Sequence, residues 1–86
     1  MKNYRVSTTR EHIIETAKSK SFGGFVNTDG DWGACRTPRE FARFLEECFG
    51  FDVVDCEKTE VGPAVAIIQM GRRILFVANN GHVSFR

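Results

Sequence analysis

The chain has 86 residues, which gives room for one domain and too little for two, so we treat residues 1–86 as a single globular unit. Hydrophobic residues make up 42% of the chain and charged residues 27%, which excludes a disordered or fibrous protein and requires a packed core. Twelve basic residues against eleven acidic ones leave a net charge of +1, which excludes a global field that would attract nucleic acid or an acidic membrane.

The first predicted element is a helix that starts in the sequence TTRE at residues 8–11. Thr8 as the N-cap and Glu11 three positions later form a capping box. In this motif the Thr side chain accepts the backbone N–H of the Glu, and the Glu side chain accepts the backbone N–H of the Thr. The helical pattern runs toward Gly23-Gly24 and has a short apolar face: Ile13, Ile14, Ala17 and Phe22. We expect this helix to pack on the core by that face.

A second helix is predicted over residues 38–49, in the sequence TPREFARFLEECFG. Thr37 and Glu40 repeat the capping box, and Pro38 stands at a helix position where its missing N–H group costs nothing. Gly50 is suited to the left-handed conformation that ends many helices. The apolar face is longer than that of the first helix: Phe41, Phe44, Leu45, Cys48 and Phe49. Both TTRE and TPRE are thus explained as helix starts, and neither is needed as a recognition motif.

The segment between the helices, GGFVNTDGDWGACR at residues 23–36, has a turn at Asp29-Gly30 with extended residues on either side. It predicts a short hairpin or a long structured loop.

From residue 51 the hydrophobic pattern has a period of two, which is typical of strands. The predicted strands are FDVVDCEK, AVAIIQM, ILFVAN and HVSFR, with TEVGP as a turn after the first. Gly71-Arg72 favours a type II′ turn and Asn80-Gly81 a type I′ turn. These turns pair Ile67 with Phe76, and Phe76 with Phe85.

This register decides which face of the sheet should receive the helices. It aligns Val65, Ile67, Ile74, Phe76, Ala78, Val83 and Phe85, and we expect the helices there. The reverse face would carry Ile68, Leu75 and Val77 beside His82, Ser84 and Arg86. The predicted fold is a small two-layer α+β domain, with two helices packed on an antiparallel β-meander of about four strands.

The residues least easily explained by folding lie in NTDGDWGACR. We interpret Trp32 as the anchor of a protein interface, and we place Asp29, Asp31, Arg36 and Arg39 around it as contacts. The competing interpretation is that Trp32 folds back onto the core. A calcium loop is not indicated, because Trp32 and Pro38 stand where such a loop needs Gly and Glu.

Two alternatives from other classes remain open. One is a nucleic-acid-binding module that uses an arginine patch of Arg39, Arg43, Arg72 and Arg73. The other is an enzyme that depends on Cys35, which lies just before a helix start; its base would have to be His12 or His82.

No convincing carboxylate pair or catalytic motif is present, so we expect a small non-enzymatic protein that binds a protein partner, as an accessory, inhibitor or immunity-type factor. We expect no cofactor and no metal. Cys35, Cys48 and Cys56 indicate neither a disulfide framework nor a zinc ribbon, and the longest apolar run is far shorter than a membrane span, so we expect a cytoplasmic protein. The terminal strand, HVSFR, is predicted to be an exposed edge of the sheet. Homodimerisation through the sheet face or this edge strand is a further alternative.

Overall fold

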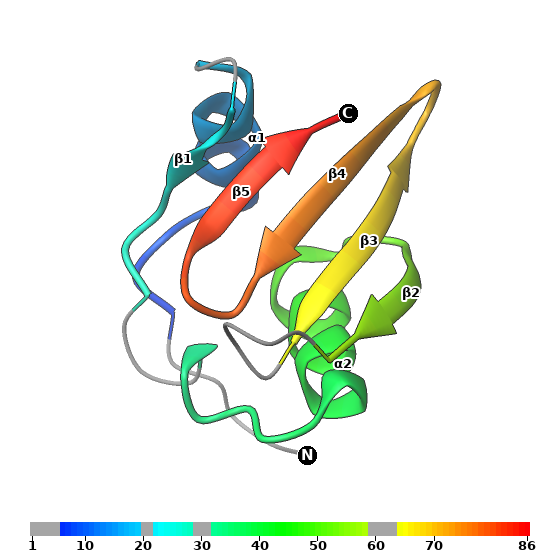
Figure 1. Cartoon of the computed structure of the whole chain (residues 1–86). Helices are drawn as coiled ribbons and strands as arrows, with labels where there is room; N and C mark the ends of the chain where they lie inside the picture. The colour runs from blue at the N-terminus through cyan, green and yellow to red at the C-terminus, as the bar shows by residue number, and fades with distance from the viewer. Residues whose placement is uncertain (1–5, 20–21, 29–31, 59–63) are drawn as a thin grey trace.

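A computed structural model describes residues 6–19, 22–28, 32–58 and 64–86. In chain order its elements are α1 (Arg10–Lys18), β1 (Gly24–Phe25), α2 (Pro38–Phe49), β2 (Val53–Glu57), β3 (Val65–Met70), β4 (Arg73–Ala78) and β5 (His82–Phe85). The strands form one antiparallel sheet in the order β1-β5-β4-β3-β2. Both helices pack on one side of the sheet (Figure 1). The predicted two-layer α+β domain is confirmed, with five strands where about four were expected.

The helix α2 spans the predicted range. Thr37 Oγ1 accepts the Glu40 N–H at 3.1 Å, and Glu40 Oε2 accepts the Arg36 N–H, also at 3.1 Å. Gly50 ends the helix at a φ of 67° and donates to the Glu46 carbonyl. The predicted apolar face is turned to the core, with Phe41, Phe44, Leu45 and Phe49 buried and Cys48 half-buried. Thr37, Pro38 and Gly50 therefore have the structural roles read from the sequence, and Glu40 binds the N–H group of Arg36, one residue before the cap.

The helix α1 starts one residue later than expected and ends earlier. Its N-cap is Thr9, whose Oγ1 accepts the His12 N–H at 3.1 Å, so the assignment of the cap to Thr8 was wrong. Ser19 closes the last turn, with its N–H and its Oγ both donating to the Thr16 carbonyl. Phe22 lies outside the helix and is 89% exposed, so it does not extend the apolar face.

The strand β1 makes β5 an internal strand, because Gly24 pairs with Val83 and Phe25 with His82. The sequence predicted that the terminal strand would be a free edge, and this was wrong. The edges of the sheet are β1, which has two residues, and β2. The Asp29-Gly30 turn and the TEVGP turn lie outside the described residues.

The turn between β4 and β5 is one residue longer than the predicted type I′ turn. The Gly81 N–H donates to the Ala78 carbonyl at 2.9 Å, and among the described residues only glycines have a positive φ, with Gly81 at 100°. This is the pattern of a type I turn followed by a residue of positive φ. Phe76 therefore pairs with Ser84, and Phe85 with Leu75. The predicted pairing of Ile67 with Phe76 is confirmed.

The extra turn residue also reverses the predicted face of the sheet. In β3 and β4 both faces are apolar, so only the alternation in β5 indicates which face is covered, and a slip of one residue inverts that indication. In the structure Ala66, Ile68, Leu75, Val77 and Val83 are buried beneath the helices. The expected helix-facing residues Val65, Ile67, Ile74, Phe76 and Ala78 lie on the opposite face and are half-buried. We call this second side the open face.

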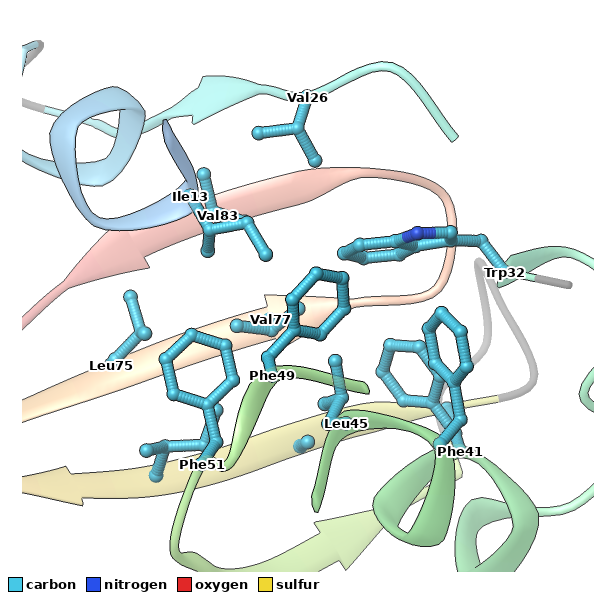
Figure 2. Close-up of a cluster of buried hydrophobic side chains, with 14 of the residues drawn as sticks. Ile13, Val26, Trp32, Phe41, Leu45, Phe49, Phe51, Leu75, Val77 and Val83 are labelled. Carbon is cyan, nitrogen blue, oxygen red and sulfur yellow. The ribbon is translucent and has the colours of Figure 1, made fainter. Parts of the chain in front are cut away.

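The core is rich in aromatic rings. Trp32 is fully buried and its ring centroid lies 5.9, 5.4 and 5.8 Å from those of Phe41, Phe44 and Phe49. Figure 2 shows the indole pointing into this cluster from the segment that precedes α2. Rings at these separations add favourable edge contacts to the burial of their area. The small side chains of Ala64 and Ala66 are also buried, which leaves room for the rings of α2 above β3.

The described part of the chain contains no helix that is long and apolar enough to cross a bilayer.

Candidate functional site

An open groove runs between the start of α2 and the edge strand β2. Its volume is about 650 Å³, and it is lined by Thr37, Pro38, Arg39 and Ala42 from the helix and Val53, Val54, Asp55 and Cys56 from the strand. We call it the α2–β2 groove. Its strand wall, β2, lies at the right-hand edge of the sheet in Figure 1. One wall is therefore a helix end, and the other is an edge strand that pairs with β3 on one side and has no strand on its outer side in the described sheet.

The capping of α2 fixes the helical wall. The side chains of Thr37 and Glu40 accept backbone N–H groups at the start of α2, and these bonds fix the local conformation that carries Pro38 and Arg39. Arg39 is exposed, and no described carboxylate forms an ion pair with it. The groove thus presents a guanidinium group that is available to an anion from outside.

A β-bulge shapes the strand wall. Val53 pairs with Ile68 and Asp55 pairs with Ile67, so Val54 is the extra residue between two adjacent partners. Val54 is 57% exposed, which makes it one of the few large apolar side chains that the described surface displays. The sequence alone indicated a regular strand here, and the bulge is what turns Val54 into the groove.

Next to the bulge, Asp55 and Cys56 complete the strand wall. Asp55 Oδ1 accepts the Cys56 N–H at 2.8 Å, so this edge amide already has a partner. Burial, and then the charge of Asp55, raise the pKa of the Cys56 thiol to about 11. The thiol is therefore protonated at neutral pH, and Cys56 contributes a small apolar surface to the groove in place of a nucleophile.

The residues predicted around Trp32 are not gathered into one surface. Trp32 has no exposed area, so the structure corrects its expected role as an interface anchor and assigns the indole to the core, which was the competing interpretation. Asp29 and Asp31 lie outside the described residues. Arg36 and Arg39 are exposed beside the start of α2, and of the two only Arg39 lines the groove.

The arginines of the nucleic-acid alternative belong to two separate regions. Arg39 and Arg43 are exposed on α2, whereas Arg72 and Arg73 are exposed at the turn between β3 and β4. Figure 1 shows that turn and α2 at opposite ends of the molecule. The guanidinium carbon of Arg73 also lies 4.2 Å from the Phe85 ring centroid, where it stacks on the ring.

The alternative based on Cys35 meets an obstacle of access. Cys35 is 4% exposed, so a substrate could not reach its sulfur without opening the core. His12 lies on α1 and His82 on β5. Within the described ranges, no group of three His, Cys, Asp or Glu side chains could hold a metal ion.

A small aromatic cluster at the β1 edge was not predicted. Phe25 is 69% exposed and its ring centroid lies 5.1 Å from that of His82. His82 Nε2 is 3.1 Å from the Phe22 carbonyl oxygen, and since a carbonyl only accepts, Nε2 carries the proton in this contact. Nothing in the local sequence separates these phenylalanines from core residues; only the position of β1 at the edge of the sheet does.

Comparison with known proteins adds no further assignment: no protein family, no curated protein and no solved structure matches this chain.

Proposed function

We propose that this protein is a non-catalytic domain that binds a segment of another protein in the α2–β2 groove. The observation that supports this function is the combination of an exposed Val54, an exposed Arg39 with no ion pair among the described residues, and a strand edge within one groove of about 650 Å³. A groove that offers apolar contact together with a few fixed polar groups is the usual form of a recognition site.

The chemistry of the walls defines the segment that fits. Val54 and Ala42 favour an aliphatic side chain, and Arg39 favours a carboxylate, with which a guanidinium group can form two parallel hydrogen bonds. We therefore expect an extended segment in which an aliphatic and an acidic side chain point toward the same wall. Arg36, exposed just before the helix, adds positive charge on that side.

The strand edge defines the binding mode. Extended peptides often add to a free sheet edge, where alternate side chains enter pockets. In β2 the Cys56 N–H is already bound by Asp55, which also protects the edge against uncontrolled pairing. Side-chain contacts with Val54 and Arg39 should therefore contribute more to the affinity than backbone pairing does.

The other classes receive less support. The buried Cys35 and the protonated Cys56 favour a binding role over thiol chemistry. A nucleic-acid site would need its arginines on one surface, and they lie on two. We retain a cytoplasmic setting as part of the proposal, because none of the three cysteines forms a disulfide.

The test is a selection of random displayed peptides on the intact protein, followed by affinity measurements with two matched pairs of variants. Arg39→Gln and Val54→Ser should each weaken the selected peptide about tenfold or more, because each removes one of the two expected contacts. Arg72→Gln, at the far turn, and Val6→Ser, another exposed valine at 40%, should leave the affinity unchanged.

The composition of the selected peptides gives a second readout, with acidic and aliphatic residues expected at fixed spacing. Peptides that bind equally to all four variants would refute the groove as the binding site. A selection that enriches no peptide would refute the proposed function itself.

A further inference from the structure

The open face of the sheet is a second surface with a defined chemical pattern. It carries apolar side chains on both central strands: Val65 and Ile67 from β3, and Ile74, Phe76 and Ala78 from β4. All five are half-buried, and no described element lies over them. Arg86 covers part of the face, since its guanidinium carbon lies 4.6 Å from the Phe76 ring centroid.

The strand register places different polar groups on the two flanks of this face: side chains of β5 on one flank and carboxylates of β2 on the other. Cross-strand partners share a face, so His82, Ser84 and Arg86 line the flank formed by β5. On the other flank, Asp55 pairs with Ile67 and Glu57 with Val65, which puts both carboxylates on the β2 side. The face therefore has Ser84 and Arg86 as donors beside His82 along one flank, an apolar middle, and carboxylates along the other flank.

Such a pattern is complementary to itself. A two-fold axis parallel to the strands, between β3 and β4, would place β5 of each copy opposite β2 of the other. It would also bring His82 opposite Glu57 of the second copy, Ser84 opposite Asp55, and Phe76 opposite Ile67. Two sheets can pack face to face in this way at about 10 Å separation.

We propose that the open face binds a second copy of this chain, with the β5 flank of each protomer against the β2 flank of its partner. A symmetric dimer of this kind uses the same patch twice, as closed dimers generally do. Pairing through the edge strand itself is disfavoured, because β2 and its flanks would bring Asp52, Asp55 and Glu57 against their own copies.

The size of the face sets the strength of the dimer. Four strands about 4.8 Å apart, with six residues at about 3.4 Å each, cover on the order of 400 Å² per copy. A standard stable interface buries about 800 Å² per partner. The dimer should therefore be weak and concentration-dependent.

The test is sedimentation equilibrium of the full chain and of two variants, Glu57→Lys and His82→Glu. His82→Glu alone sets two carboxylates against each other at both symmetric contacts, and Glu57→Lys alone removes the carboxylate from both, so self-association should weaken about tenfold or more in each variant. In an equimolar mixture of the two variants, one contact pairs His82 with Glu57 and the other pairs the introduced glutamate with the introduced lysine. The mixture should therefore regain the association that each variant has lost.

Two outcomes would overturn the proposal: a wild type that stays monomeric up to about 1 mM, a concentration that would detect even millimolar affinity, or a mixture that associates no better than its components. Circular dichroism melts of each variant check that loss of association is not loss of fold. Of the side chains placed in this interface, only Asp55 also lines the α2–β2 groove, and the two variants leave every groove residue unchanged. Binding of a selected peptide to these same variants distinguishes failure of the dimer from failure of the proposed function.

Discussion

The two faces of the sheet have nearly the same hydrophobic content on β3 and β4 but different surroundings. On the covered face Ile68, Leu75 and Val77 are at most 1% exposed and lie beneath the helices. On the open face their neighbours Ile67, Ile74 and Phe76 remain half-buried. A domain of this size buries only about 60% of its unfolded surface, so apolar side chains beyond those that fill the core are left for other contacts. Hydrophobic content alone therefore does not identify the folding face.

The largest predicted effect on stability comes from removal of the Trp32 ring from the covered face. We expect Trp32→Ala to lower the free energy of unfolding by about 3–5 kcal/mol, since it leaves a cavity among Phe41, Phe44 and Phe49. This loss of unfolding free energy is measured by chemical denaturation with circular dichroism as the signal. Trp32→Phe is the control: it keeps an aromatic ring and removes an indole N–H that has no acceptor in the described structure, so it should cost much less. A loss below about 1 kcal/mol for Trp32→Ala would contradict the core assignment.

A substitution in the turn between β4 and β5, which sets the register of β5, should have a smaller effect on stability. Gly81→Ala should cost about 1–3 kcal/mol, because the residue has a φ of 100° and an added Cβ would lie 2.6 Å from the Val26 carbonyl oxygen. Gly33→Ala is a matched control, since its Cβ would meet nothing within 4 Å. Thermal melts of the two variants should separate clearly; equal melting temperatures would contradict the positive φ of Gly81 and its close approach to Val26.

The smallest predicted effect is the pH dependence of stability caused by Cys56, which lies on β2 beside the groove. The pKa of Cys56 is about 11 in the folded protein against an ordinary value of 9.0, so between these values the unfolded chain loses a proton that the folded chain keeps. Its contribution to stability is therefore complete below pH 9 and is lost as the pH rises toward 11. Denaturation at pH 8 and pH 10.5 should show a greater decline for wild type than for Cys56→Ala. The same decline in both would contradict the shift.

Local sequence signals predicted α2 well, because its cap, its proline and its final glycine all act within a few residues. They failed at Thr8 and Thr9, where two adjacent residues of one type could each serve as the cap and the structure uses Thr9. They failed again at Asn80-Gly81, since Asn-Gly fits both a two-residue turn and the end of a longer one.

The candidate site was predicted only in part. Arg39 was named from the sequence, but the residues that face it across the groove come from β2. The strand follows the start of α2 by the whole length of the helix, so no local sequence pattern indicates that the two lie together. The bulge at Val54 was equally hidden, because it depends on how β2 aligns with β3. Trp32 was assigned to the surface because its flanks are charged, while its burial depends on the rings of α2.

Adjacent isoleucines on opposite faces of β3 give the most direct measurement. We would determine the free energy of unfolding of Ile67→Ala and Ile68→Ala beside wild type by chemical denaturation. If the helices cover the face of Ile68, which is 1% exposed, then Ile68→Ala should cost about 2–4 kcal/mol and Ile67→Ala about 1 kcal/mol or less. The reverse order would place the helices on the other face, and it would contradict both the groove and the open surface described above.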